Sequence, residues 1–444
     1  MYTELLRKNP SYLRLWMAQA VSLLGDWFTT IALSTLVARF SNGSGVAVGG
    51  LLLARFLPPV LVGPFAGVLI DRLNRKHLLI FSDAVRAVIA LLFLFASRPD
   101  RLWMIYALTI LQAALSALFE PCRSALLPAL VEDRDLVLAN TLGSTTWSVM
   151  LAAGAVVGGA VAAIFGTSIA LCIDAASFVI SALLIASIRV DPARVSSSHD
   201  ESHPKHIVEA GRRGSFLAGL RYIASQPATA AALLIKLGGN VGNADLFMVI
   251  YATQLFVIGE NGTGSLGILY GAFGAGALLG AVVVNYLGNV SVVQMRRLII
   301  VSYICLLIGW FVLGSANSLA LASLALMIRA IGAEFYWVYS NVILQKTVPD
   351  QFRGRVFALD LAGYQFATVA SALVTGALVD QGARLSGISL STALRITTTG
   401  QAVFTAGQPA MRLIAYGFGV ASLAPLMLWG LALPWIERQR VVEA

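Results

Sequence analysis

The chain has 444 residues, of which 58% are hydrophobic and only 12% are charged, and its formal net charge is +9. Soluble domains usually carry about 25% charged residues, so this much apolar surface requires lipid rather than water around it. The basic residues stand in short loops, without the basic and aromatic clusters typical of nucleic-acid binding, so the positive charge does not indicate a nucleic-acid partner.

The sequence contains twelve apolar runs that are long enough to cross a bilayer as helices. Six lie in the first half of the chain, at 12–39, 46–70, 77–97, 102–121, 136–164 and 167–188. Six lie in the second half, at 228–257, 263–287, 292–314, 318–345, 356–380 and 410–436. These runs predict an all-α integral membrane protein with twelve transmembrane helices in two pseudo-symmetric six-helix bundles.

A polar segment over 189–227 separates the two halves, and its Pro, Gly and Ser residues indicate a flexible linker. Residues 215–227 at its end mix apolar and basic residues and predict a short amphipathic helix on the membrane surface. We therefore expect an N-terminal bundle over 1–188, a cytoplasmic linker over 189–227 and a C-terminal bundle over 228–444. The linker contains three histidines, His199, His203 and His206, which are interpreted as solvated residues. We therefore expect no metal site there. We also expect no cofactor.

Lysine and arginine are concentrated in alternate loops, which predicts the orientation of the chain in the membrane. The enriched loops include the linker and lie on the same side as both termini. We therefore expect a multi-pass protein of the plasma (inner) membrane with both termini in the cytoplasm. The first apolar run is too long for a cleaved signal peptide.

A charged break between the second and third predicted helices reads Gly67-Val-Leu-Ile-Asp-Arg-Leu-Asn-Arg-Lys76. It resembles the loop of the major facilitator superfamily, whose pattern is Gly-x-x-x-Asp-Arg/Lys-x-Gly-Arg-Arg/Lys. The matching residues are Gly67, Asp71, Arg72, Arg75 and Lys76. Asn74 stands where the family has glycine, and asparagine tolerates the left-handed conformation that a tight turn requires.

Other stretches resemble the branch of this superfamily that contains enterobactin exporters and macrolide efflux pumps. They are Asn9–Trp16, Ser82–Arg86, Asp174–Phe178 and Val348–Val356. The resemblance covers nearly the whole chain. It implies transport of a small molecule across the lipid bilayer, and it does not identify the substrate.

The resemblance also implies that the charged loop is a cytoplasmic latch between the two halves. Asp71 would accept hydrogen bonds from Arg75 and from the N-terminal amides of the eleventh helix near Phe357, because a carboxylate is favoured at the positive end of a helix. The corresponding position in the second half is Asn285, so we expect the latch in the first half only. Two further residues at the end of the fourth predicted helix extend the charge network: Glu120 and Arg123.

Charged residues within the apolar runs are functional candidates, since a charge at mid-bilayer costs about 3 kcal/mol. Asp26 lies in the middle of the first run and Glu334 in the middle of the tenth. Both are candidates for carrying a coupling proton. For Asp26, an ion pair with Arg55 or with another base is the structural alternative.

The remaining polar residues of the apolar runs are candidates for lining a central cavity. Spacings of four and three place Lys236, Asn240 and Asn243 on one face of the seventh predicted helix. The other cavity candidates are Arg55, Asp245, Arg329 and Trp337. Asp83 and Arg86 are one turn apart and predict a local ion pair, whereas Asp174 receives no role.

The favoured function is secondary active transport, driven by protons, that exports a small amphipathic compound resembling a drug, a macrolide or a siderophore. The chain has no phosphate-binding loop of the Gly-x-x-x-x-Gly-Lys-Ser/Thr type and no pattern of catalytic residues, so we do not expect an enzyme. A facilitator or importer of the same fold remains an alternative, and so does a non-transporting membrane sensor or scaffold. We expect a monomer.

Overall fold

The computed structural model describes residues 2–132, 135–189, 221–288, 290–385 and 408–442. Within these ranges every regular element is a helix, which confirms the predicted all-α class. The described residues include 12 helical segments that are long and apolar enough to cross a membrane, as the sequence predicts.

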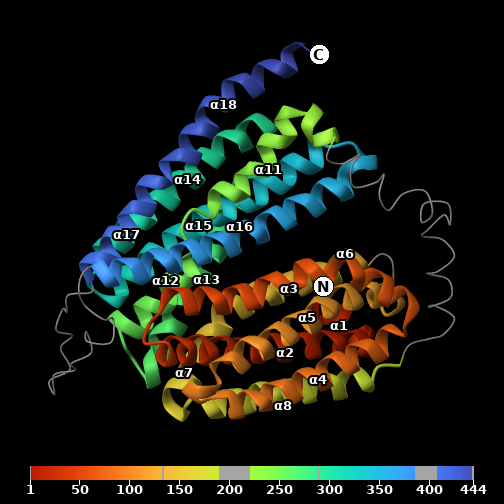
Figure 1. The fold of residues 1–444 in the computed structure, drawn as a ribbon. Coiled ribbons are helices and arrows are strands. Elements are labelled where there is room, and N and C mark those ends of the chain that lie inside the picture. The colour runs from red at the N-terminus through yellow and green to blue at the C-terminus, as the bar shows by residue number, and fades with distance from the viewer. Residues whose placement is uncertain (1, 133–134, 190–220, 289, 386–407, 443–444) are drawn as a thin grey trace. The chain divides into compact units, whose positions relative to one another are not determined.

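The helices separate into two compact units (Figure 1). The first unit contains eight labelled helices together with the segment Met248–Gly271. Its helices are α1 (Tyr2–Lys8), α2 (Pro10–Phe40), α3 (Gly45–Arg72), α4 (Arg75–Ala96), α5 (Leu102–Leu126), α6 (Leu136–Val149), α7 (Ala155–Phe165) and α8 (Thr167–Ala186). Glu260 helps to hold Met248–Gly271 in this unit, because its Oε2 atom accepts a hydrogen bond of 3.1 Å from the backbone of Thr167.

The second unit consists of two parts of the chain, Lys205–Phe247 and Ala272–Ala444. Its helices are α11 (Pro227–Gly239), the first residues of α12 (Ala244–Ile250), most of α13 (Thr263–Leu287), α14 (Val292–Ser315), α15 (Leu319–Thr347), α16 (Asp350–Leu385), α17 (Gln408–Ala421) and α18 (Leu423–Val442).

Local sequence signals explain several helix starts. Pro10 is the first residue of α2, where its missing N–H costs nothing because the first helical amides have no partner within the helix. Ser291 and Gln294 form a capping box that starts α14. The side chain of Asn74 caps α4 by accepting hydrogen bonds from the backbone of Lys76 and His77 at 3.0 and 3.3 Å.

Asn74 has φ −65° and ψ 115°, so it adopts an extended conformation. The left-handed conformation, which asparagine would tolerate at the glycine position of the family pattern, is therefore not used here. Asparagine is used here as a helix cap, a role that needs its side-chain oxygen and not an unusual backbone conformation.

Four predicted spans differ from single uninterrupted helices of the expected length. The seventh is broken between α11 and α12, and the fifth contains a π-helical turn at Met150–Gly154. The twelfth divides into α17 and α18 at Ser422. The eleventh is α16, which begins at Asp350, so Phe357 lies inside this helix and not at its N-terminal amides as expected.

Each unit has its own apolar core, and its outer surface is apolar as well. One core cluster in the first unit includes Tyr12, Phe119 and Ile185, and one in the second unit includes Ile299 and Trp429. Large apolar side chains also stand exposed, among them Phe95, Trp103, Leu183, Phe366 and Leu431. An apolar core beneath an apolar exterior is the arrangement expected for helices surrounded by lipid.

Candidate functional site

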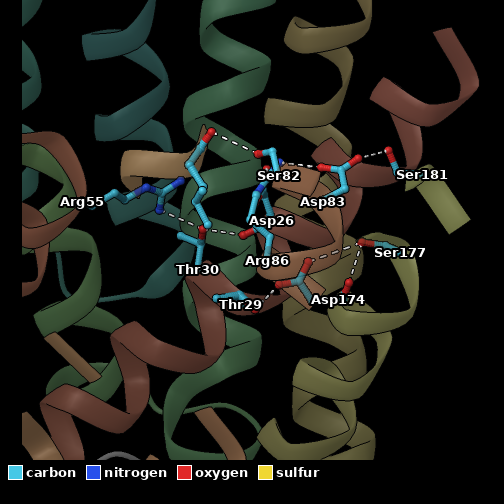
Figure 2. Close-up of polar contacts among 11 residues, drawn as sticks. Asp26, Thr29, Thr30, Arg55, Ser82, Asp83, Arg86, Asp174, Ser177 and Ser181 are labelled. Carbon is cyan, nitrogen blue, oxygen red and sulfur yellow. Dashed lines mark hydrogen bonds and ion pairs between the residues drawn. The ribbon is translucent and has the colours of Figure 1, made fainter. Parts of the chain in front are cut away.

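Three carboxyl groups lie around one guanidinium group in the first unit (Figure 2). Asp26 comes from α2, Asp83 and Arg86 come from α4, and Asp174 comes from α8. The Nη2 atom of Arg86 donates to both carboxylate oxygens of Asp26 at 3.1 Å, and its Nη1 atom donates to Asp83 at 3.1 Å. One base thus holds two acids from two different helices.

This ion-pair network is almost entirely removed from solvent on the α4 side. The side chains of Arg86 and Asp83 are 2% and 0% exposed, whereas that of Asp26 is 31% exposed. The second oxygen of Asp83 accepts a hydrogen bond of 2.5 Å from Ser181. The guanidinium of Arg86 also lies 4.0 Å from the ring centre of Phe178, a cation–π contact.

These contacts answer two questions that the sequence left open. The predicted local pair of Asp83 and Arg86 is confirmed. Of the two partners considered for Asp26, the structure shows the other base, Arg86, and not Arg55. Spacing along α4 could not reveal this, because Arg86 is 60 residues away from Asp26 in the chain.

Asp174 is the buried acid of this cluster that has no base as a partner within the described part of the chain. It is 0% exposed, and its carboxyl group accepts hydrogen bonds from the hydroxyl groups of Thr29 and Ser177. Gly25 makes this approach of α2 and α8 feasible, since a Cβ atom there would collide with Ser177 and Asp174. A carboxyl group so placed is best accommodated in its neutral form.

A pocket with a volume of about 260 Å³ lies beside this cluster, between α2, α3 and α5. Asp26 and Arg55 both line it, together with hydroxyl and amide side chains such as Thr109 and Gln112. Arg55 donates a hydrogen bond of 2.8 Å to the Thr30 hydroxyl (Figure 2). Arg55 thus lines a pocket of the first unit, and its place in a central transport cavity stays a prediction.

The second unit contains a buried ion pair between Lys236 of α11 and Asp360 of α16. The two side chains are 3% and 2% exposed. Lys236 also donates a hydrogen bond of 2.8 Å to Asn341, and its ammonium lies 4.3 Å from the ring centre of Trp337. Trp337 is packed edge-to-face against Tyr364 at 5.0 Å.

The proposed stripe on the seventh helix needs correction. α11 ends at Gly239 with Asn240 as its C-cap, and Gly242 has φ +72°, so Lys236, Asn240 and Asn243 do not lie on one continuous helix. Helical spacing therefore does not align them, because a residue with positive φ interrupts the helix. Asn240 and Asn243 instead contact α16, where Thr368 donates to Asn240 at 3.1 Å.

The remaining candidates of the second unit are distributed around α15. Arg329 is 4% exposed, lies 4.0 Å from the ring centre of Trp310 and has Asp245 as an electrostatic neighbour. Glu334 is half-buried, and no described residue makes an ion pair with it. The structure does not bring Arg329 and Glu334 into an ion pair, in agreement with the 140° that separates two residues five positions apart on a helix.

The expected charged loop is mostly helical: Gly67–Arg72 form the end of α3, Arg75 and Lys76 begin α4, and only Leu73 and Asn74 lie between the two helices. The side chains of Asp71 and Arg72 lie outside what the structure describes, so the predicted contacts of Asp71 stay a prediction, as does the role of Gly67 in the latch. Arg75 begins α4, and Lys76 donates a hydrogen bond of 2.7 Å to the carbonyl of Ile188. Lys76 therefore joins the start of α4 to the end of the sixth span.

The extended charge network and the linker are also described in part. Arg123 is buried in α5 and packs against Gly143 of α6, whereas the side chain of Glu120 lies outside the described part. The linker histidines at 199, 203 and 206 lie outside the described residues. Of the expected amphipathic helix over 215–227, residues 221–227 are described: 221–225 are helical, Gln226 is not, and Pro227 begins α11.

Two site residues received no role from the sequence. Asp360 was overlooked although it is an acid in an apolar run, the same signal that marked Asp26. Asp174 receives no role from the sequence, because its partner Thr29 on α2 is 145 residues away in the chain.

Residues 15–361 match the model of the Major Facilitator Superfamily. A Bacillus subtilis protein named "Putative bacilysin exporter BacE" is 26% identical over 356 residues, which cover 80% of this chain and 84% of that protein. Macrolide efflux protein A of Streptococcus pyogenes is 23% identical over 356 residues, covering 78% of this chain and 83% of the relative.

Among solved structures, the crystal structure of the nucleoside transporter NupG matches with a TM-score of 0.71 at 11% identity, covering 95% of this chain and 98% of NupG. At that identity the match speaks for the fold. The family and the named relatives are transporters and not enzymes, as the sequence predicts. With a family match that spans most of its length, the chain belongs to the Major Facilitator Superfamily.

Proposed function

We propose that the chain is a secondary active transporter that uses a proton gradient to export a small amphipathic compound. The observation that carries this proposal is the imbalance of charge in the first unit, where three acids lie around one base: Arg86 pairs with Asp26 and Asp83, and Asp174 accepts hydrogen bonds from hydroxyl groups instead. If all three acids were ionised, two uncompensated charges would lie in the apolar layer. Such charges are costly there, so the cluster is suited to hold at least one proton.

The exposure of the side chains distinguishes the acid that stays protonated from the acid that exchanges a proton. Asp174 is fully buried and contacts hydroxyl groups, so it is suited to remain neutral. Asp26 is the most exposed of the three and lines the pocket, so it can exchange a proton with the transport path. Protonation of Asp26 would weaken its ion pair with Arg86. The link between α2 and α4 would then depend on the proton.

In the second unit, Glu334 is the other proton-coupling candidate. It is half-buried and lies on α15, the helix that also carries Trp337 and Arg329. A proton that enters from outside neutralises Asp26, Glu334 or both, releases the substrate outward and favours return to the inward-open state. The two halves, 1–188 and 228–444 joined by the linker 189–227, alternate in exposing the site to either side.

The direction of transport is supported by the names of the relatives, a bacilysin exporter and a macrolide efflux protein. The positive-inside pattern supports insertion in the plasma (inner) membrane with both termini in the cytoplasm. The protein acts as a monomer in this proposal, since each chain of this fold would carry its own pathway.

The proposal is tested by efflux of a compound panel from an efflux-deficient bacterial host that produces the protein, with and without a protonophore. We expect at least one compound to be exported, and its export to stop when the protonophore is added. In inverted vesicles, Asp26→Asn and Glu334→Gln should reduce transport that is driven by an imposed pH difference. The surface variant Asp100→Asn is the matched control and should leave transport unchanged.

Three outcomes would contradict the proposal. Transport of the same compound that is indifferent to the protonophore and to Asp26→Asn would indicate a facilitator. Accumulation inside the cells would indicate an importer. Unchanged susceptibility to every compound would favour a sensor or scaffold.

A further inference from the structure

The pocket of the first unit carries two charges of opposite sign that are not paired with each other. Asp26 of α2 and Arg55 of α3 both line it. The described contacts of Arg55 include a hydrogen bond to Thr30 and a cation–π contact with Phe56, and they include no ion pair with a carboxylate. Thr30 stands between the two charges, since its hydroxyl also donates to the backbone carbonyl of Asp26 at 2.6 Å.

The two sides of the pocket also differ in their charge balance. On the α4 side, Arg86 is shared between Asp26 and Asp83, so this side keeps a surplus negative charge even when Asp174 is neutral. On the α3 side, the positive charge of Arg55 lacks a described counter-ion. A cation alone or an anion alone would satisfy only one of these two sides.

The walls between the two charges are partly apolar. Leu33, Leu51, Leu52 and Phe56 line the pocket together with the charged residues. Hydroxyl and amide groups from α2 and α5 supply additional hydrogen-bonding positions. The pocket volume of about 260 Å³ is enough for a small polar head with a short apolar side chain, and it lies slightly below the usual range of drug-sized sites.

We propose that this pocket binds a small zwitterion, with its ammonium group at Asp26 and its carboxylate at Arg55, and that its apolar side chain packs against Leu33, Leu51 and Phe56. The inference rests on the proposed transport function and names the substrate class for that function. A guanidinium group suits a carboxylate because it presents N–H donors in a planar fork, and a carboxylate accepts hydrogen bonds from an ammonium.

In this pocket, substrate binding and proton binding involve the same residue. Asp26 is the residue that would both accept the substrate ammonium and exchange the coupling proton. When Asp26 is protonated, the pocket loses its negative charge on that side. The zwitterion then loses one of its two charged partners, and it is released.

The test is equilibrium binding to the purified full-length protein in lipid nanodiscs, with no proton gradient present. The probes are leucine, phenylalanine and tryptophan, each as the free amino acid, as its N-acetyl derivative and as its C-terminal amide. We expect at least one free amino acid to bind about tenfold more tightly than either of its derivatives, which corresponds to one lost charged contact. Equal binding of all three forms, or no binding of any probe, would overturn the proposal.

Two variants then assign the two ends of the ligand. Arg55→Gln should remove the preference for the free amino acid over its amide and leave the preference over the N-acetyl form. Asp26→Asn should do the opposite. The matched controls are Arg98→Gln and Asp100→Asn, an exposed pair outside the pocket, and they should leave all affinities unchanged. A failure of either variant to change its own end of the ligand would contradict the assignment.

The binding test separates this inference from the proposed function. Loss of selectivity for the free amino acid overturns the zwitterion site even if proton-driven export of another compound is found. Conversely, the protein could bind the free amino acid selectively while its transport does not depend on the proton gradient. That result would overturn the proposed proton coupling and would not contradict the zwitterion site.

Discussion

The Nη2 atom of Arg86 lies 3.1 Å from both carboxylate oxygens of Asp26, which joins α4 to α2. The same guanidinium holds Asp83 through its Nη1 atom. Arg86 therefore pairs with a fully buried acid, Asp83, and with an acid that borders a pocket, Asp26. This sharing makes the network sensitive to the charge on either acid.

Removal of the shared base should destabilise the protein more than removal of the base together with its buried partner. Arg86→Gln leaves Asp83 buried without a cation, and the free energy of unfolding should fall by about 3–5 kcal/mol. The double variant Arg86→Gln/Asp83→Asn should recover much of this loss. Unfolding of the purified protein in detergent measures both values.

The exposed pair of Arg98 and Asp100, at 3.5 Å, is the control for this comparison. Arg98→Gln should change the free energy of unfolding by less than about 1 kcal/mol, because exposed ion pairs contribute little. If the single and the double variant were equally destabilised, Asp83 would not depend on Arg86 for its charge balance.

Asp174 should tolerate a neutral polar replacement and not an apolar one. Asn at this position keeps an oxygen that accepts from Thr29 and Ser177 and resembles the neutral acid, so Asp174→Asn should leave stability nearly unchanged. Asp174→Leu leaves those two hydroxyl groups without their acceptor, at a cost of about 1–3 kcal/mol for each buried group. Thermal unfolding compares the two variants directly.

Infrared spectroscopy gives a second measurement for Asp174. A neutral carboxylic acid absorbs separately from a carboxylate, so Asp174→Asn should remove one protonated-carboxyl band from the spectrum of the protein at neutral pH. An unchanged spectrum, or equal tolerance of Asn and Leu, would mean that Asp174 is not the neutral acid.

The buried pair of Lys236 and Asp360 provides a test in the second unit. Asp360→Leu leaves the ammonium of Lys236 buried with only Asn341 and Trp337 beside it, and we expect a loss of about 3–5 kcal/mol in the free energy of unfolding. Lys236→Met/Asp360→Leu removes both charges and should be much closer to the original protein. A double-mutant cycle on unfolding measures the interaction, and additive effects of the two single changes would argue against the pair.

The sequence was sufficient for the features that depend on composition along the chain. The twelve apolar runs match the 12 candidate spans, because an apolar run of this length is a property of the segment itself. The pair of Asp83 and Arg86 was predictable for a similar reason, since helical spacing alone brings them together.

Contacts between helices that are distant in sequence could not be predicted in this way. The partner of Asp26 was one of several bases, and Arg86 is selected only by the tertiary arrangement in which α2 and α4 both pack against α8. The helix break at Gly242 could not be predicted either, because a glycine in an apolar run is compatible with both a continuous helix and an interruption. The stripe that was inferred for Asn240 and Asn243 failed for this reason.

The cytoplasmic latch remains a prediction with a direct test. Asp71→Asn should slow conformational cycling more than it weakens substrate binding, because the carboxylate is expected to stabilise one state and not to contact the substrate. Transport rate in vesicles and equilibrium binding in detergent measure the two effects separately. Asn285→Ala, at the corresponding position of the second half, should affect neither, and an equal impairment would contradict a latch that exists only in the first half.

The cap at Asn74 gives the last prediction, which concerns the position where the family pattern has glycine. The Asn74 side chain accepts hydrogen bonds from the backbone of Lys76 and His77, and its φ of −65° requires no glycine. Asn74→Ala should therefore lower the free energy of unfolding by about 1 kcal/mol, whereas Asn74→Gly should lower it by only a few tenths of a kcal/mol. If Asn74 were selected for a left-handed turn, glycine would instead stabilise the protein relative to asparagine. Unfolding of the three proteins in one detergent distinguishes the two cases, because the cap and the turn predict opposite signs for the glycine variant.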